Sequence, residues 1–228
     1  MTAKDRYEAV SAELARICQE EGREATDVVL VAVSKTVGCE DVADAIEAGA
    51  RDFGENRPDQ LMEKADAFPT CNWHFIGNIQ SRRLKDIVGR ATLIHSLFEE
   101  SHARKINDLA RDKGIVQDVL IEVNVSGEDS KSGLKPDEVP AMLAVCAELD
   151  HVRVRGLMTM APQGDSDVAR ETFAGLARLR DELRATMSPE EAACFSELSM
   201  GMSEDWREAI AEGATIVRVG RAIFSDTF

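Results

Sequence analysis

The sequence predicts an α/β fold, a (β/α)8 TIM barrel that forms a single domain over residues 1–228, with one extra helix before the first strand. Short runs of β-branched and apolar residues alternate with segments of helical periodicity eight times along the chain. Eight such units favour a closed parallel barrel over an open doubly wound sheet, which usually has about five or six strands. The length of 228 residues is also close to the roughly 250 that is typical of such a barrel.

The first strand is predicted at Val28–Lys35, because a run of small and β-branched apolar residues is typical of a strand buried on both faces. A helix over residues 3–21 precedes it, since apolar side chains recur there at steps of three and four. The first half then continues with helix Glu40–Ala48, strand Arg51–Glu55, helix Pro58–Ala67, strand Trp73–Gly77, helix Arg83–Val88, strand Thr92–Leu97 and helix Glu99–Lys113. The second half continues with strand Asp118–Val125, helix Pro136–Leu149, strand Val152–Met158, a helix within Val168–Met187, strand Glu197–Met200, helix Glu204–Glu212 and strand Thr215–Gly220.

The composition argues against several classes of function. The 42 acidic residues against 27 Lys and Arg give a formal charge of −15, whereas a nucleic-acid-binding surface needs clustered basic residues. An anionic ligand must be held by local donors, because the overall field repels it. Apolar runs are too short to span a membrane and the first residues are too polar for a signal peptide, so a cytoplasmic location is expected. The five cysteines and four histidines lack the spacing of a zinc site or redox pair, which favours reduced thiols.

Lys35, at the end of the first strand, is the first candidate for chemistry. Ligands bind at the carboxyl ends of the strands in parallel α/β folds, so this amine is expected at the barrel rim beside apolar walls. Desolvation lowers the pKa of an ammonium group, which would suit Lys35 to form an imine with an aldehyde or ketone. The alternative is a lysine that ends the strand and points into water.

A phosphate site in such barrels commonly forms between the loops after the seventh and eighth strands. The loop after the seventh strand reads Ser199–Asp205, with Ser203 as the expected N-cap of the next helix. Gly220 ends the eighth strand, where the lack of a side chain lets a ligand approach the backbone. Either residue alone could be an ordinary cap or turn residue, but together on these two loops they favour an anion site.

Arg218 is expected to point into the mouth of the barrel. If Ile216, Arg218 and Gly220 share one face of the eighth strand, Val217 and Val219 pack against the helices. A buried arginine is costly unless acceptors receive its protons. Those acceptors could be a structural carboxylate such as Glu122 or a ligand atom such as a ring nitrogen.

Eight short strings distributed from the first predicted strand to the last carry a resemblance to a known family. They are Val-Ser-Lys-Thr (33–36), Phe-Gly-Glu-Asn (53–56), Trp-His-Phe-Ile-Gly (73–77), Ile-His-Ser-Leu (94–97), Val-Asn-Val-Ser-Gly (123–127), Arg-Gly-Leu-Met (155–158), Leu-Ser-Met-Gly-Met-Ser (198–203) and Val-Arg-Val-Gly (217–220). With these strings the sequence resembles the YggS type of pyridoxal phosphate homeostasis protein. The resemblance implies the barrel of the N-terminal domain of bacterial alanine racemase, with pyridoxal 5′-phosphate (PLP) held as an internal aldimine.

The resemblance also implies a set of cofactor-binding residues, with no catalytic residue and no metal ligand. Lys35 would form the Schiff base and Arg218 would face the pyridine nitrogen. Ser199 would hold the phosphate together with the backbone that follows the eighth strand, and a residue after the second strand would contact the cofactor. The full set is Lys35, Asn56, Ser199, Arg218, Gly220 and Arg221.

Other positions in or beside these strings receive weaker assignments. His74 is expected to make a core or supporting hydrogen bond, and Lys131 to lie on a mobile surface loop near the mouth. The chain departs from the family pattern at Arg221, which could add charge near the phosphate or extend into solvent. It also departs at Asn78, whose role stays open, and at Ser225, where the change is expected to be harmless.

The resemblance implies PLP binding for intracellular PLP homeostasis without robust catalysis. In alanine racemase a tyrosine from an additional domain of the partner chain supplies a second base, whereas the only tyrosine here is Tyr7 in the first predicted helix. Arginine stays protonated, so a ring nitrogen facing Arg218 remains unprotonated and the ring is a weaker electron sink. The alternative is a PLP-dependent amino-acid racemase, or another Schiff-base enzyme, of low activity. PLP-dependent apoenzymes are the implied partners, and a monomer is expected because the sequence ends after the predicted barrel.

Overall fold

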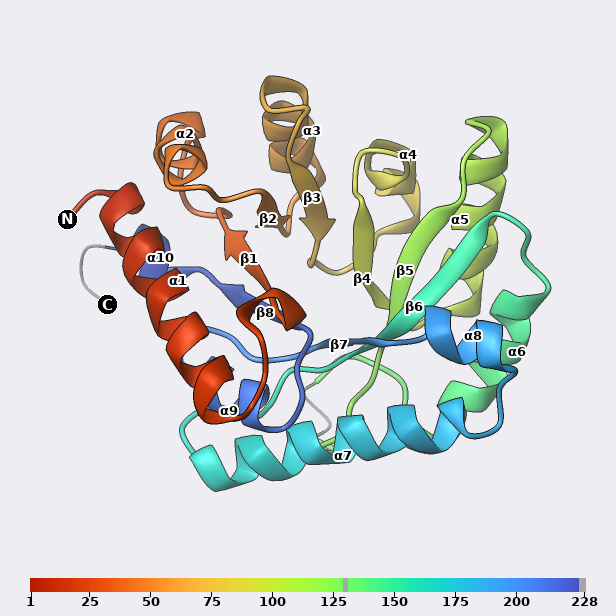
Figure 1. Cartoon of the computed structure of the whole chain (residues 1–228). Helices are drawn as coiled ribbons and strands as arrows, with labels where there is room; N and C mark the ends of the chain where they lie inside the picture. Colours follow the sequence, from red (N-terminus) through yellow and green to blue (C-terminus); the bar gives the residue numbers. More distant parts are fainter. Residues whose placement is uncertain (129–130, 226–228) are drawn as a thin grey trace.

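The computed structural model describes residues 1–128 and 131–225 and forms a closed barrel (Figure 1). Eight strands follow one another around the barrel in chain order, and β8 pairs with β1 to close it. All neighbouring strands are parallel, so a crossover on the outside of the barrel must return the chain to the same end each time. The (β/α)8 barrel expected from the sequence is confirmed.

Helices alternate with the strands in the described residues. The strands are β1 Val29–Val33, β2 Asp52–Glu55, β3 Asn72–Phe75, β4 Leu93–Leu97, β5 Gln117–Glu122, β6 Val152–Met158, β7 Glu197–Ser199 and β8 Ile216–Val219. The α-helices are α1 Ala3–Glu20, α2 Cys39–Glu47, α3 Pro58–Ala67, α4 Leu84–Ile87, α5 Glu100–Asp112, α6 Val139–Ala147, α7 Ser166–Arg184, α8 Pro189–Cys194, α9 Trp206–Ala211 and α10 Arg221–Phe224. Short 3-10 turns occupy Ala25–Asp27, Ser81–Arg83 and Pro136–Glu138.

Two apolar cores follow from the alternation of side chains along each strand. The smaller core lies inside the barrel and consists of Val31, Val33, Leu93, Leu120, Met158 and Ile216. The larger core lies between strands and helices, where the rings of Phe53 and Trp73 stack with centroids 5.3 Å apart. Because residues two apart share a side, each strand's inward positions can be counted from these anchors up to the carboxyl end.

The extra N-terminal helix is also confirmed. Thr2 and Asp5 form a capping box that starts α1, and the buried face carries Tyr7, Val10, Leu14 and Ile17. This helix contacts α2, α9 and α10, so it covers the outside of the barrel beside the β8–β1 junction (Figure 1). The Arg6 side chain ties it there by donating to the carbonyl of Ile223 at 2.7 Å.

Several boundaries differ from the expectation. The helices α8 and α10 are additional, and α8 begins with its own capping box at Ser188 after α7 has ended. The helix after β7 begins at Trp206, so Ser203 is not its N-cap and the prediction was wrong; Asp205 occupies that position. The reason is a turn in which the Asp205 carboxylate accepts the N–H of Met202 at 2.6 Å, so that the helix starts at Trp206 instead of Glu204.

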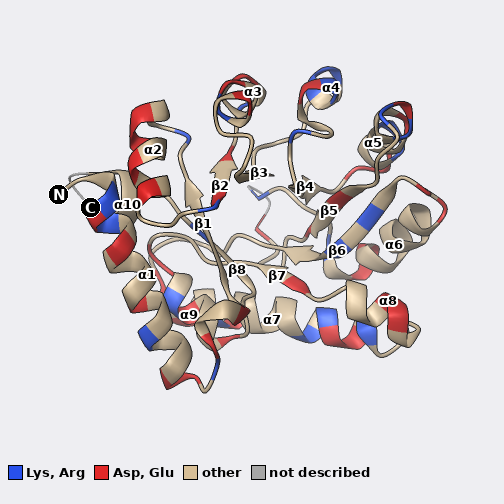
Figure 2. Cartoon of the chain, turned by 45° about the horizontal axis from the view of Figure 1, so that its top comes forward, with Lys and Arg blue, Asp and Glu red and all other residues tan. Residues whose placement is uncertain are grey.

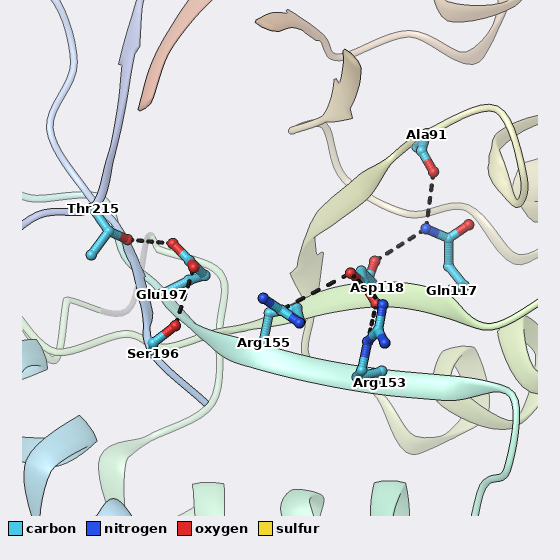
Figure 3. A network of polar contacts seen from close by, with 8 residues as sticks. All are labelled: Ala91, Gln117, Asp118, Arg153, Arg155, Ser196, Glu197 and Thr215. Carbon is cyan, nitrogen blue, oxygen red and sulfur yellow. Dashed lines mark hydrogen bonds and ion pairs between the residues drawn. The ribbon is translucent and has the colours of Figure 1, made fainter. Parts of the chain in front are cut away.

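The amino-terminal end of the barrel is held by polar contacts between strands (Figure 3). Arg153 on β6 forms a two-pronged ion pair with Asp118 on β5, at 2.6 and 3.0 Å. The buried Gln117 amide donates to the carbonyl of Ala91 at 3.0 Å, and Thr215 donates to Glu197 at 2.6 Å. These contacts stabilise the amino-terminal end, which is opposite the end at which ligands bind in such barrels.

The helices α2 and α8 carry acidic residues and no Lys or Arg (Figure 2), in keeping with the formal charge of −15. Within the described residues, no helix has the length and apolar character needed to cross a membrane.

Gly156 is predicted to be the position in β6 least tolerant of a side chain. Its φ is +153°, and an added Cβ would lie 2.0 Å from the carbonyl oxygen of Glu197 on β7. The strand would have to separate from β7, so Gly156→Ala should lower the free energy of unfolding by at least about 3 kcal/mol. Urea unfolding followed by circular dichroism measures this. Gly38→Ala is the control, because nothing lies within 4 Å of its added Cβ, and a loss similar to that of Gly156→Ala would contradict the steric explanation.

Candidate functional site

A cavity of about 540 Å³ opens at the carboxyl ends of the strands. Its walls come from the loops after β1, β2, β3, β6, β7 and β8, so residues far apart in the sequence meet there. Side chains of both charges and amides line it beside methionines. The lining residues are Val33, Lys35, Thr36, Asn56, Ile76, Gly77, Asn78, Met158, Met160, Gln163, Met202, Ser203, Glu204, Asp205, Arg218, Gly220 and Arg221.

Lys35 follows β1 directly and lines this cavity. Val33 points into the barrel, so the alternation brings Lys35 to the same side. The residue as a whole is exposed, and the desolvation expected from apolar walls is therefore not found. The amine is open to a ligand that comes from solvent.

The loops after β7 and β8 meet across the cavity at Ser203 and Gly220. The Gly220 N–H donates to the Ser203 hydroxyl at 3.2 Å, and Ser203 is only 5% exposed. Gly220 also lies close to β1, because an added Cβ would be 3.2 Å from the carbonyl oxygen of Val33. The Arg221 side chain forms an ion pair with Glu204 at 2.6 Å, and both side chains are about half exposed. A hydroxyl and backbone groups, rather than an unpaired cation, therefore surround this part of the cavity.

Arg218 lies inside the barrel, as its position in β8 predicted. Ile216 belongs to the inner core and Val217 and Val219 to the outer one. The guanidinium is 4% exposed and donates to Ser199 Oγ at 2.5 Å and to the carbonyl of Thr159 at 3.0 Å. Burial lowers the pKa of Arg218 to about 10, so it still carries its charge at neutral pH. Since Arg218 also lines the cavity, that charge faces a bound ligand.

Glu122 does not accept a hydrogen bond from Arg218, although it was one of the two expected acceptors. It is 2% exposed, and neither carboxyl oxygen has a hydrogen-bond partner among the described residues. Desolvation raises the pKa of Glu122 to about 7, and the charge of Arg218 opposes that rise only in part. The carboxyl group is therefore partly protonated at neutral pH.

Ser199 lies below the cavity rather than in its wall. It is fully buried, and its hydroxyl lies 2.8 Å from Nδ1 of His95 on β4. Because Arg218 donates to the same hydroxyl, the lone pair and the proton of Ser199 are both engaged. Ser199 does not line the cavity, whereas Ser203 does.

Ser199 is one member of a hydrogen-bonded chain across the barrel, which we call the interior relay: Arg218, Ser199, His95, His74 and Asp52. His95 Nε2 lies 2.8 Å from His74 Nδ1, and His74 Nε2 lies 3.2 Å from Asp52 Oδ1. His74 thus makes the supporting hydrogen bond that was expected. Sequence reasoning missed His95, although both histidines occupy inward positions on neighbouring strands.

The direction of the interior relay is determined by its two ends. Arg218 can only donate, and the Asp52 carboxylate can only accept. Complete burial, followed by the charges of His74 and Arg218, holds the pKa of His95 well below its ordinary 6.5, so this ring carries a single proton. If Nδ1 of His95 accepts the proton of Ser199, its Nε2 donates to His74, and every bond points from Arg218 toward Asp52. The relay orients the guanidinium without forming a direct ion pair.

The remaining predicted residues divide between the cavity and its surroundings. Asn56 is exposed and lines the cavity, where its backbone packs so closely on Gly77 that an added Cβ there would lie 2.1 Å from the Asn56 carbonyl. Asn78 lines the cavity too. Lys131 does not, since its Nζ donates to the carbonyl of Ala161 at 3.4 Å, and residues 129 and 130 of its loop lie outside the described residues. All five cysteines are free thiols.

These residues fit a phosphorylated pyridine aldehyde. An accessible amine stands at one wall, a buried charged donor faces the floor, and a hydroxyl with backbone groups borders a glycine at another wall. Donors of this neutral kind suit an anion in a protein whose overall field repels it. No group of three or more His, Cys, Asp or Glu within the described residues could hold a metal ion.

The chain is similar to proteins of known family over nearly its whole length. Residues 8–227 match the family "Alanine racemase, N-terminal domain". A pyridoxal phosphate homeostasis protein of Aquifex aeolicus is 39% identical, with 99% of each chain covered. The crystal structure of a protein from Bifidobacterium adolescentis is 36% identical, with a TM-score of 0.91, and 97% of this chain and 94% of that one are covered. PipY of Synechococcus elongatus with PLP bound is 31% identical, with a TM-score of 0.80, and 93% of this chain and 100% of that one are covered.

The first prediction from this geometry concerns the tautomer of His95. Because its pKa is lowered by burial, His95 should remain neutral and protonated at Nε2 near pH 6.5, where an ordinary histidine changes its charge. Long-range proton–nitrogen NMR correlation distinguishes this tautomer from the alternatives. An imidazolium signal for His95 at pH 6, or a proton on Nδ1, would contradict the direction of the interior relay.

The second prediction concerns Glu122 and pH. In the unfolded chain this carboxyl loses its proton near pH 4.5, whereas the folded protein keeps it up to about pH 7. Between these values the unfolded state binds fewer protons, so this group lowers stability as the pH rises and the loss is complete above about pH 7. Relative to Glu122→Gln, wild type should therefore lose roughly 1–3 kcal/mol of unfolding free energy across this window.

Urea unfolding of both proteins without added ligand at pH 4.5 and 8 measures the difference. Glu8→Gln on the exposed face of α1 serves as the control, because it makes the same substitution at a side chain that is open to solvent. Equal pH dependence in wild type and Glu122→Gln would show that folding does not raise the pKa of Glu122.

Proposed function

The chain belongs to the alanine racemase N-terminal domain family and, within it, to the pyridoxal phosphate homeostasis proteins, and on that premise we propose that it binds PLP covalently at Lys35 and serves PLP homeostasis. The observation that carries the proposal is the meeting of Lys35, Arg218, Ser203 and Gly220 around one cavity. The PLP-bound state of PipY, which is 31% identical, supports the same ligand here.

Each wall of the cavity would bind a different part of the cofactor. The cofactor supplies an aldehyde, with which a neutral lysine amine forms a C=N bond and releases one water molecule. Arg218, held by Ser199 and Thr159, would donate to the ring nitrogen. Ser203 and the backbone of Gly220 and Arg221 would bind the phosphate.

Asn56 and Ser199 were also predicted to contact the cofactor, and the two residues would have different roles in this arrangement. Asn56 would contact the cofactor from the wall formed after β2, which its place in the cavity lining supports. Ser199, originally assigned to the phosphate, would act only by holding Arg218.

Weak turnover is expected from the same residues. Arg218 keeps its proton at neutral pH, so the ring nitrogen that it faces receives a hydrogen bond but no proton. The only tyrosine, Tyr7, is buried under α1 in the outer core and does not line the cavity, so it cannot act as a base there. Binding and release of the cofactor are therefore favoured over racemisation.

The proposal extends to the setting in which the protein works. Five free thiols are typical of a reducing compartment, which supports a cytoplasmic location. The charge of −15 argues against nucleic acid as a partner. An exposed Lys35 would let PLP-dependent apoenzymes receive the cofactor from a single-domain, monomeric carrier.

Lys35→Ala tests the function directly. Wild-type protein incubated with PLP should become yellow and, after borohydride reduction, should gain one cofactor mass at Lys35 by peptide mass spectrometry. Lys35→Ala should lose both signals and stay folded, because the side chain is exposed and makes no packing contact in either core. Lys105→Ala, on the exposed side of α5, is the matched control and should behave like wild type.

Two results would count against the proposal. A borohydride-stable link that persists in Lys35→Ala would place the attachment elsewhere. Rapid exchange of the Cα proton of single-enantiomer amino acids in deuterated water, at rates of about 1 s⁻¹ or more, would identify an enzyme rather than a carrier.

A further inference from the structure

A buried ion pair lies directly behind Lys35, on the side of the barrel wall that faces the helices. Lys64 of α3 and Glu55 at the end of β2 have side chains that are 2% and 0% exposed, and Lys64 Nζ lies 2.5 Å from Glu55 Oε1. The Ser34 hydroxyl donates to the same oxygen at 2.6 Å. Neither charged residue lines the cavity, so the contacts proposed above for the cofactor do not include them.

The contacts of this pair converge on the backbone around Lys35. Lys64 Nζ donates to the carbonyl of Ser34 at 2.7 Å, and the Val37 N–H donates to the same carbonyl at 3.1 Å. Gln60, one turn before Lys64 on α3, completes the set. In the amide orientation that satisfies both of its ends, it donates to the carbonyl of Lys35 and to Glu55 Oε2, each at 3.1 Å. The carbonyls before and after the Lys35 Cα are therefore both held from outside the barrel.

The register of the strands explains why the pair and the amine lie on opposite sides of the wall. Val33 pairs with Gly54, so Ser34 and Glu55 are the next neighbours. Val33 belongs to the inner core, and the alternation turns Ser34 toward the helices and Lys35 back toward the cavity. Glu55, two residues after the outward Phe53, faces α3 as well.

Stability alone does not account for such a pair. Removing a lysine and a glutamate from water costs about as much as their attraction returns, and apolar residues of similar volume are often as stable. What the pair adds is a defined geometry, because each hydrogen bond fixes an angle as well as a distance. Without it, the Ser34 carbonyl would lack side-chain support on the outer face of the barrel wall.

We propose that Glu55 and Lys64, together with Gln60, are positioning residues that hold the two peptide groups flanking Lys35, so that its amine projects into the cavity ready for attachment to PLP. This inference rests on the proposed function. It assigns a role in attachment to residues that never touch the cofactor.

Two variants separate positioning from folding. The double variant Glu55→Leu/Lys64→Met replaces the pair with apolar side chains of similar size and removes the hold on the Ser34 carbonyl. Gln60→Ala removes only the contacts of a half-buried amide and should fold in any case. Gln117→Leu is the matched control, because it removes a buried amide that holds the Gly89 N–H and the Ala91 carbonyl at the other end of the barrel (Figure 3).

The main measurement is the rate of borohydride-trappable attachment at Lys35 as a function of PLP concentration. The limiting rate should fall at least ~10-fold in the double variant and ~3-fold in Gln60→Ala, since misplacing a reacting group slows its step. The half-saturating concentration should stay within about twofold, because the residues that bind phosphate and ring are unchanged. Without ligand, the Val37 amide should exchange its hydrogen faster in the double variant than in Gln117→Leu.

Each result of these measurements leads to a distinct conclusion. If wild type fails to attach PLP at Lys35, the proposed function itself is wrong. If wild type attaches it but both variants match Gln117→Leu in limiting rate, the positioning role is overturned and the pair is only structural. Should the double variant fail to fold, Gln60→Ala decides alone, and a limiting rate equal to wild type overturns the proposal.

Discussion

The burial of one guanidinium inside the barrel constrains most of what surrounds it. Arg218 keeps its charge and so needs acceptors, which are the Thr159 carbonyl and the Ser199 hydroxyl. Ser199 can accept well because its own proton has an acceptor on His95. The hydrogen bonds continue from His95 through His74 to Asp52, near the opposite end of the barrel. One cation thereby determines the polar contents of the interior across five strands.

The two chemical groups of the site are held from opposite sides of the barrel wall. The interior relay holds the guanidinium from within, while Glu55 and Lys64 lie behind the amine in the layer between strands and helices. Apart from Asp52, both systems are nearly inaccessible to solvent, whereas Lys35 is exposed. A buried frame with one accessible amine would suit the proposed uptake and release of PLP, because neither event would then require the frame to rearrange.

The sequence could predict those features of the site that follow from the alternation of side chains along a strand. It placed Arg218 inside the barrel from its neighbours in β8, and the same counting would have found His95. It could not distinguish Ser199 from Ser203, because both stand on the loop side of one short strand. The turn that Asp205 closes brings Ser203 beside Gly220 at the cavity, whereas Ser199 lies below the cavity.

The sequence by itself determined the barrel, its leading helix and the family, because buried strands, helical periodicity and strings at the strand ends are local patterns. Only the tertiary structure decided which serine reaches the cavity, that Glu122 has no hydrogen-bond partner among the described residues, and that Lys64 pairs with Glu55 behind Lys35. These outcomes depend on the relative placement of side chains from different strands and helices. No local pattern encodes that placement, since it emerges only when the closed sheet sets the register of every strand against its neighbours.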